Sequence, residues 1–303
     1  MISVIMAAYN EKISELNRAI KSILDQTYSD IELIVICDNP KNKEMQEYLR
    51  KISSSDKRLK VYYNEKNIGL AESLNKAIQL TNGEFIARMD ADDYSFPVRL
   101  EKQLAYIKET NYDLVGALIE CVDENGNTIY SMKNMPASNE KVLKKVEFNN
   151  PLAHPTWFAK REVFIKNKGY RPVPYAEDYD FILRAILNGF KLGNVSEILF
   201  KYTIRETSIS KSNGLKQFLI SKSLIEKYKN KTLSTDTVES ICAVLHGVQE
   251  EDEKKYAEAS EFFAKAVRKA ENKNPVFVIL ILEAFIHSKY YRKKIMGYIK
   301  AFL

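Results

Sequence analysis

Cysteine and histidine are scarce in this sequence, and neither forms a pattern. The 303 residues include three cysteines, Cys37, Cys121 and Cys242, and three histidines. An odd and scattered set of cysteines argues against a disulfide framework, and no spacing typical of zinc ligands accompanies it. The sequence therefore predicts reduced thiols and a cytoplasmic protein.

Long apolar runs are also missing. The longest, residues 276–282, stops at Glu283, whereas a helix needs about 20 apolar residues to cross a bilayer. No basic leader of the kind that a secretory signal requires precedes the first apolar segment, residues 2–8. The sequence thus predicts neither a membrane-spanning helix nor a secreted protein.

Charge is distributed unevenly along the chain. Residues 1–210 contain 29 basic and 29 acidic side chains, whereas residues 211–303 contain 17 and 11. The whole net charge of +6 therefore belongs to the last third. Such a segment indicates either an anionic partner or a solvated helical face, and composition leaves both open.

Strand and helix patterns alternate through the first hundred residues. Apolar segments predict strands at 2–8, 31–37, 59–63 and 85–89. Helical patterns lie between them, at 16–24, 42–52 and 70–80. This order predicts right-handed βαβ units, a mostly parallel sheet, and a ligand site beyond the carboxyl ends of the strands.

The rest of the chain has a different pattern. The turn Asp123-Glu124-Asn125-Gly126 lies between strand-like segments 114–121 and 127–130 and predicts a hairpin. A short helix at 181–187 and a last strand at 198–204 follow, and beyond Ser210 only helical patterns remain. Residues 256–267 have the apolar spacing of a packed helix and resemble half of a tetratricopeptide repeat, without a second copy. We therefore predict two domains, 1–212 and 213–303, the second one helical.

An acidic tetrad, Asp90-Ala91-Asp92-Asp93, directly follows the fourth predicted strand. Alternate side chains of an extended segment share a face, so Asp90 and Asp92 can point to one place. Neighbouring carboxylates repel each other unless a cation lies between them, and Mg²⁺ or Mn²⁺ is commonly held by one or two carboxylates and phosphate oxygens. The pattern predicts a metal–phosphate site. The alternative is an Asp-rich turn that caps the next helix.

Polar residues also follow the other three predicted strands. They are Tyr9-Asn10, Asp38-Asn39 and Asn67-Ile68-Gly69. In a parallel sheet the carboxyl ends of the strands meet at one edge, which is where ligands bind. These segments and the tetrad are therefore expected to converge on one site.

Five motifs occur in order along residues 1–210: SVIMAAYNE, IVICDNP, NIGLAESLN, ARMDADD and AEDYDF. In this combination the chain resembles the family 2 glycosyltransferases, an inverting group with the GT-A nucleotide-sugar fold. The resemblance implies an α/β fold with a Rossmann-like mixed sheet, followed here by a C-terminal helical region. The RMDADD form is similar to that of transferases that build bacterial exopolysaccharide, capsule or lipopolysaccharide.

The resemblance also implies roles for individual residues. Tyr9 and Glu11 match positions that cradle uracil and ribose, and Asp38 matches an acidic residue that bonds the base. Asp92 matches the metal ligand, next to the diphosphate. The other implied nucleotide-binding positions are Ala8, Asn67, Gly69, Asp90 and Ala91. For Gly69, an ordinary turn glycine before a helix is the alternative.

In the last motif, Asp178 matches the family's catalytic base, and its neighbour Glu177 is assigned to the acceptor side. Acidic residues in the first turn of a helix are also favoured by the helix dipole, without any function. His154 and Trp157, in the segment LAHPTWF, are further acceptor-side candidates. A structural histidine and a core tryptophan are the alternatives.

Three departures from the family pattern concern the diphosphate contacts. Leu74 precedes Asn75 where many relatives have a basic residue, and Asp38-Asn39-Pro40 lacks a second acidic residue. Arg205 stands near the place of a histidine that can join the metal in relatives. Arginine cannot bind a cation, but it can pair with a phosphate oxygen.

Together these features predict a transferase that depends on Mn²⁺ or Mg²⁺. It would move a hexose or N-acetylhexosamine from a UDP-sugar to a hydroxyl of a glycan or lipid-linked glycan, with no nucleic-acid partner. Two alternatives stay open: a non-catalytic assembly module with the same fold, and a nucleotidyltransferase. The second would need a glycine-rich loop where this chain has Ala7-Ala8-Tyr9-Asn10.

The C-terminal segment suggests a peripheral membrane contact. Residues 289–294, KYYRKK, precede an apolar stripe of Ile295, Met296, Tyr298, Ile299 and Phe302. A basic, aromatic helix with such a stripe can lie in an anionic membrane surface, here the inner face of the cell membrane. The alternatives are a helix docked on the helical domain and a contact in a homo-oligomer.

Overall fold

The computed structural model describes residues 1–205, 213–271 and 274–302. The packing of the chain divides it into two compact units. We call the first the sheet unit; it comprises residues 1–146, 150–172 and 180–205. The second, the helical unit, comprises residues 147–149, 173–179 and the described residues after 205. The predicted boundary at 212/213 adjoins residues 206–212, which lie outside the described residues.

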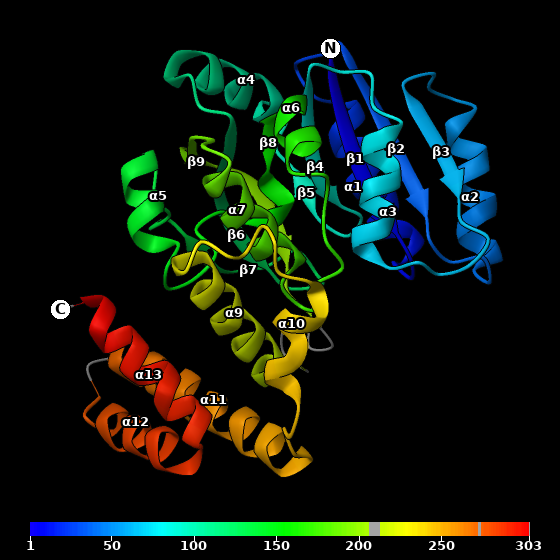
Figure 1. The fold of residues 1–303 in the computed structure, drawn as a ribbon. Coiled ribbons are helices and arrows are strands. Elements are labelled where there is room, and N and C mark those ends of the chain that lie inside the picture. Colours follow the sequence, from blue (N-terminus) through cyan, green and yellow to red (C-terminus); the bar gives the residue numbers. More distant parts are fainter. Residues whose placement is uncertain (206–212, 272–273, 303) are drawn as a thin grey trace. The chain divides into compact units, whose positions relative to one another are not determined.

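The described part of the sheet unit contains one mixed sheet of nine strands (Figure 1). The strands are β1 Ile2–Ala8, β2 Ile31–Cys37, β3 Leu59–Tyr63, β4 Phe85–Asp90, β5 Tyr94–Ser95, β6 Leu114–Val122, β7 Thr128–Met132, β8 Phe158–Lys160 and β9 Leu192–Thr203. Their order is β3-β2-β1-β4-β8-β6-β9-β5, and β7 pairs with β6. β1 to β4 pair in parallel, as predicted, whereas β5, β7 and β8 pair antiparallel.

Helices connect and flank these strands. They are α1 Ile13–Leu24, α2 Lys43–Ser53, α3 Leu70–Gln79, α4 Arg99–Thr110, α5 Asn139–Lys145, α6 Arg161–Lys166 and α7 Glu177–Leu187. A 3-10 turn, His154–Thr156, precedes β8. The helices α1 to α3 supply the βαβ connections that force β1, β2, β3 and β4 to run the same way.

The parallel strands form the centre of the sheet unit's core. Every residue of β2 is buried, because the strand pairs with β1 on one side and β3 on the other and is covered on both faces. This burial explains why β1 and β2 are nearly continuous apolar runs rather than alternating patterns.

The helical unit contains α9 Gly214–Lys229, α10 Val238–Cys242, a 3-10 turn Ala243–Leu245, α11 Glu250–Glu271, α12 Val276–His287 and α13 Lys289–Phe302. Its small core consists of Leu215, Leu219, Tyr256, Ala259, Ala284, Tyr291 and Ile295. The predicted packed helix at 256–267 is the central part of α11. Among the described residues, none of the helices is both long and apolar enough to cross a bilayer.

Candidate active site

The carboxyl ends of β1, β2 and β4 meet at one edge of the sheet. The register pairs Ala8 with Cys37 and Ala7 with Asp90, so these parallel strands end nearly level with one another. The residues that follow each strand are therefore neighbours at this edge. It is the edge at which open α/β sheets bind their ligands.

Asp38, directly after β2, holds the loop that leads into α3. Its buried carboxylate accepts hydrogen bonds from the backbone N–H of Ile68 (2.9 Å), the backbone N–H of Gly69 (2.8 Å) and Nδ2 of Asn64 (2.7 Å). Gly69 has φ +84° and also donates to the Asn67 side chain (2.9 Å). A carboxylate has about four acceptor positions. Asp38 thus fixes the loop and keeps little capacity for a direct bond to a ligand.

The acidic tetrad lies against two arginines. The Asp90 carboxylate forms an ion pair with Arg88, which is buried in β4. Oδ2 of Asp92 lies 3.0 Å from Nη2 of Arg205. Asp93 is buried; its Oδ1 is hydrogen-bonded, whereas its Oδ2 has no partner within the described residues. The carboxylates of Asp90 and Asp92 therefore pair with different arginine side chains, Arg88 and Arg205.

The backbone of the tetrad is held from the neighbouring strand and helix. The carbonyl oxygen of Asp92 accepts hydrogen bonds from Nη2 of Arg18 (2.7 Å) and Oγ1 of Thr203 (2.8 Å). Oδ1 of Asp93 accepts one from the backbone N–H of Thr203 (2.7 Å). These bonds tie the turn after β4 to α1 and β9, so the Asp92 side chain starts from a fixed backbone.

Negative charge is in excess at this edge. Burial raises the pKa of Asp92 to about 6; the charge of Asp90 adds to the shift and Arg205 opposes it. Burial raises the pKa of Asp93 well above its usual value, and Asp90 and Asp92 contribute. Burial also raises the pKa of Glu11; backbone bonds oppose the shift, and the charges of Asp92 and Asp90 add to it. An added positive charge would lower all three pKa values.

Such a cluster fits a divalent ion only in part. Within the described ranges, no three acidic, histidine or cysteine side chains are placed to hold an ion by themselves. A hard ion can be bound by one carboxylate together with substrate phosphates and water, and Asp92 meets that requirement. Arg205 also contacts Oε2 of Glu15 (2.8 Å), so its charge is shared and does not neutralise Asp92 fully.

Tyr9 and Glu11 form the rim of this edge. The Tyr9 side chain is exposed, and its backbone N–H donates to Oε2 of Glu11 (2.8 Å). Ala8 and Ala91 are buried and present no side chain to a ligand. Every predicted nucleotide position therefore belongs to the sheet unit and follows, or ends, one of the first four strands, apart from Gly69 at the start of α3.

A family model described as glycosyl transferase family 2 matches residues 3–168, which is more than half of the chain. The chain belongs to glycosyltransferase family 2.

Curated relatives agree with this assignment. The chain is 39% identical over 239 residues to the O-antigen biosynthesis glycosyltransferase WbnJ of Escherichia coli, covering 77% of this chain and 91% of WbnJ. It is 37% identical to an uncharacterized glycosyltransferase of Methanocaldococcus jannaschii, covering 76% of this chain and 80% of the relative. It is 35% identical to the putative glycosyltransferase EpsE of Bacillus subtilis, covering 68% and 73%.

A solved structure supports the fold. The crystal structure of S. aureus TarS 1-349 aligns with 99% of this chain, and 91% of its own chain is covered, with a TM-score of 0.58 and 19% identity. The GT-A-type fold expected from the sequence is thus confirmed. The family also confirms the prediction of a glycosyltransferase over the two alternatives, a non-catalytic module and a nucleotidyltransferase.

The last motif of this family 2 enzyme spans the division between the units. Glu177 and Asp178 open α7 and pack with the helical unit, whereas Asp180 packs with the sheet unit. Asp180 is buried and forms ion pairs with Arg171 and Arg184. Because Asp180 is engaged in the core, Asp178 stays the candidate base of the motif.

His154 and Trp157 do not lie on an open surface. Trp157 is fully buried and packs against His154, Tyr170 and Phe181, with ring centroids 4.5, 6.2 and 5.3 Å away. Nε2 of His154 is 2.9 Å from the Tyr170 hydroxyl, and burial lowers the pKa of this histidine, which keeps it neutral. Stacking of Trp157 on a sugar is therefore wrong, and core packing is its role.

Sequence reasoning missed the buried arginine of the site. Arg88 is a charged residue inside the apolar strand segment EFIARM, two positions before Asp90. Residues two apart on a strand share a face, so the pairing was readable from the sequence. The contacts of Arg18 and Glu15 were not, because α1 reaches the tetrad only in the folded chain.

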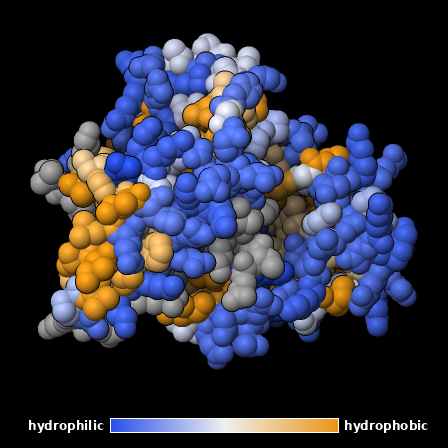
Figure 2. Space-filling view, turned by 90° about the horizontal axis from the view of Figure 1, so that it is seen from below, coloured by the Kyte–Doolittle hydropathy of each residue, from blue (hydrophilic) through white to orange (hydrophobic). Residues whose placement is uncertain are grey.

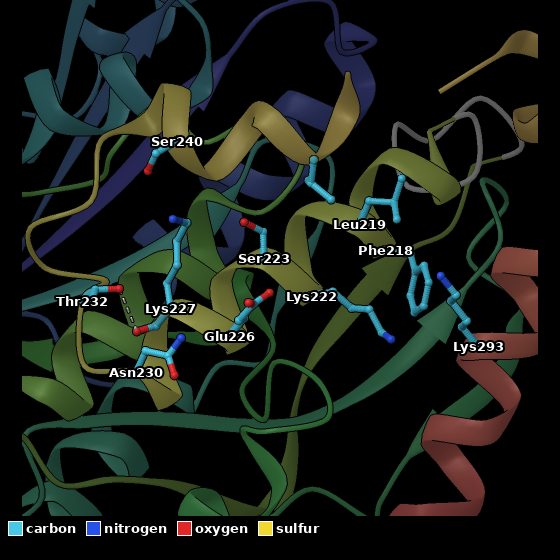
Figure 3. Close-up of a pocket in the computed structure, with 11 residues that line it drawn as sticks. Phe218, Leu219, Lys222, Ser223, Glu226, Lys227, Asn230, Thr232, Ser240 and Lys293 are labelled. Carbon is cyan, nitrogen blue, oxygen red and sulfur yellow. Dashed lines mark hydrogen bonds between the residues drawn. The ribbon is translucent and has the colours of Figure 1, made fainter. Parts of the chain in front are cut away.

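A separate cavity of about 460 Å³ lies in the helical unit (Figure 3). Residues of α9, α10 and α13 line it, among them Phe218, Lys222, Lys227, Ser240 and Lys293. None of the residues that the family motifs predict is in its lining. The predicted site residues therefore lie at the sheet edge and not around this cavity.

Proposed function

We propose that this family 2 enzyme is a metal-dependent, inverting glycosyltransferase that takes a hexose or N-acetylhexosamine from a UDP-sugar. The observation that carries the proposal is the group of Glu11, Asp90 and Asp92 at the carboxyl edge of the sheet, beside the loop fixed by Asp38. Clustered carboxylates favour a cation and its diphosphate, and burial raises the pKa of Glu11 and of Asp92 in this cluster.

The names of two relatives favour polysaccharide synthesis as the process. They are an O-antigen biosynthesis enzyme, WbnJ, and an amylovoran biosynthesis enzyme, AmsE of Erwinia amylovora, to which this chain is 29% identical. We infer that the acceptor is a glycan or lipid-linked glycan, and that the enzyme works in the cytoplasm at the inner face of the cell membrane.

The proposed reaction is a single displacement. The acceptor hydroxyl oxygen attacks the anomeric carbon, its proton passes to the Asp178 carboxylate, and the bond between the anomeric carbon and UDP breaks. Attack opposite the leaving group inverts the configuration, so an α-linked donor yields a β-glycoside. A sugar hydroxyl is a very weak acid at neutral pH, so a positioned base is required.

Residues of the sheet edge would stabilise the donor. Tyr9 and Glu11 would contact the nucleoside, while Asp38 shapes the loop of Asn67 and Gly69 beside it. A divalent ion bound through Asp92 would neutralise charge on the departing diphosphate. Arg205 is placed next to Asp92 and would pair with a phosphate oxygen when donor binds.

The test is a panel of UDP-sugars, scored for UDP release and UDP affinity with Mn²⁺ and with chelator. We expect release only with metal, and loss of release in Asp92→Asn. Asp178→Asn should lose about 10²–10⁴-fold in rate, the usual worth of a general base, with UDP affinity unchanged. Full activity of Asp92→Asn or of Asp178→Asn would contradict the corresponding role. Asp56→Asn, a carboxylate that pairs with Arg58 away from the sheet edge, is the control.

A further inference from the structure

The helix α12 presents an apolar face to solvent. Ile279, Leu282 and Ile286 are 57%, 54% and 74% exposed, and Val278 is about half exposed. We call these four residues the apolar stripe. Figure 2 shows hydrophobic residues gathered over one part of the surface seen there. Exposed apolar side chains of this size in one group mark an interaction surface rather than an ordinary solvated helix.

The opposite face of α12 is also apolar. Ala284 is fully buried there, and Phe285, seven residues after Val278 and so at the border of the stripe, packs on the same core. Apart from the exposed Glu283, α12 is apolar on most of its surface, and such a helix is normally covered by neighbours. The core of the helical unit covers one face of α12, so the apolar stripe needs a second, external partner.

The last helix, α13, adds positive charge beside the stripe. Tyr291 and Ile295 of α13 are buried in the core of the helical unit, so part of the apolar face predicted for α13 packs on that core. Its exposed face carries Arg292 and Met296. The Arg292 guanidinium lies 5.5 Å from the Phe285 ring of α12. This contact places a cation at the border of the stripe.

The charge decides between two occupants of this surface. A second copy of the chain would bring the same cations, Arg292 among them, close to each other across a two-fold axis. Residues 211–303 also carry the whole net charge of +6. An anionic lipid surface instead attracts the cations and accepts the apolar side chains.

We propose that α12 and the exposed face of α13 form a docking surface for an anionic membrane. The apolar stripe enters the boundary between headgroups and acyl chains, while Arg292 and neighbouring lysines contact lipid phosphates. The helix lies in the surface and does not cross it. The idea rests on the proposed function only in that a lipid-linked acceptor would be found at such a surface.

The test is co-sedimentation of the full chain with vesicles of phosphatidylcholine, alone or mixed with phosphatidylglycerol, without donor or acceptor. We expect binding to the mixed vesicles only, weakened by salt. The triple variant Ile279→Gln, Leu282→Gln, Ile286→Gln should bind on the order of tenfold less or worse, because three apolar anchors are lost. Arg292→Gln should weaken binding to the anionic vesicles.

The matched control is Ile165→Gln. Ile165 lies on α6 of the sheet unit and is 57% exposed, the same fraction as Ile279. The Ile165→Gln variant should bind the vesicles as well as the unchanged chain does. If the triple variant is poorly folded by circular dichroism, Ile286→Gln alone, at the most exposed position, replaces it.

Three outcomes would overturn the proposal. They are no binding by the unchanged chain, equal binding to neutral vesicles, and undiminished binding by the stripe variant. A dimer that the stripe variant dissociates, with no vesicle binding, would assign the surface to a second copy. Since binding is measured without substrates, failure here leaves sugar transfer untouched, and loss of transfer leaves vesicle binding untouched.

Discussion

At the scale of single residues, the carboxylate of Asp38 bonds mainly to other parts of the protein. Its carboxylate joins the end of β2 to the loop before α3, and Asn64, which donates to it, in turn accepts a bond from Nζ of Lys76 (2.7 Å). The chain Lys76–Asn64–Asp38 thus fixes the shape of a loop that faces the proposed nucleoside. If the proposed function is right, Asp38 would affect donor binding by positioning this loop rather than by direct contact.

Asp38→Asn tests that role. The amide would turn a donor toward the backbone N–H of Ile68 or Gly69, so one partly buried hydrogen bond of the loop is lost, at a cost of about 1 kcal/mol. We expect a lower free energy of unfolding by urea titration and weaker UDP binding. Asp123→Asn is the control, because Asp123 also accepts backbone bonds, from Asn125 and Asn127, but in an exposed turn. Equal losses of stability and of UDP affinity in both variants would mean that the hydrogen bonds of Asp38 to the loop have no special importance.

At the scale of elements, prediction succeeded where a segment's own side chains decide its structure. β1, β2 and β3 have the predicted bounds, because each is a short apolar segment bounded by polar or turn residues. β8 was missed, because its three residues become a strand only by pairing with β4 and β6. β9 starts at Leu192 rather than 198, because Asn194 looks polar in sequence yet is buried, and its amide donates to Pro136 and Pro151 carbonyls.

The packing of α3 against the loop after α6 could not be predicted either. The Asn75 side chain accepts from the backbone N–H of Tyr170 (2.8 Å) and donates to its carbonyl (2.9 Å). Next to it, Gly169 has φ +67°. Leu74, which stands where many relatives have a basic residue, is fully buried. Asn75 thus joins two segments that are 95 residues apart in the sequence.

Gly169→Ala tests this junction. A Cβ at Gly169 would lie 2.3 Å from Oδ1 of Asn75, whose amide is held by two bonds. We expect a loss of about 2–3 kcal/mol in the free energy of unfolding, from the clash and the positive φ together. Gly126→Ala is the control, since Gly126 has φ +86° and no atom within 4 Å of the added Cβ; the positive φ alone should cost about 1 kcal/mol. Equal losses in the free energy of unfolding would show that the Asn75 side chain moves away from the added methyl group without cost.

At the scale of the whole molecule, the chain separates two kinds of chemistry. Residues 1–210 are neutral overall and contain the acidic sheet edge, whereas residues 211–303 carry the positive charge and the apolar stripe. One part thus suits a cation with its diphosphate, and the other suits an anionic surface. The two can be perturbed independently, because they share no residue.

One carboxylate at the amino ends of the parallel strands, Glu32, is expected to make the stability of the fold depend on pH. Glu32 is buried near the start of β2 and accepts hydrogen bonds from Ser3 Oγ (2.6 Å), Lys60 Nζ (2.7 Å) and the backbone N–H of Asn82 (2.7 Å). It therefore links β1, β3 and the turn before β4. Burial by itself raises the pKa of Glu32, but these bonds outweigh it and lower the pKa from 4.5 to about 2.

Because the folded-state pKa is below the unfolded value, this carboxylate stabilises the fold above pH 4.5, and the contribution disappears as the pH falls toward 2. The shift corresponds to roughly 2–3 kcal/mol. We expect Glu32→Gln to unfold at lower urea than the unchanged chain at neutral pH, with the gap narrowing through this acid range. Glu47→Gln, on an exposed position of α2, is the control and should follow the unchanged chain. A gap that stays constant from neutral pH down to pH 2 would show that the charge of Glu32 does not hold the strands together.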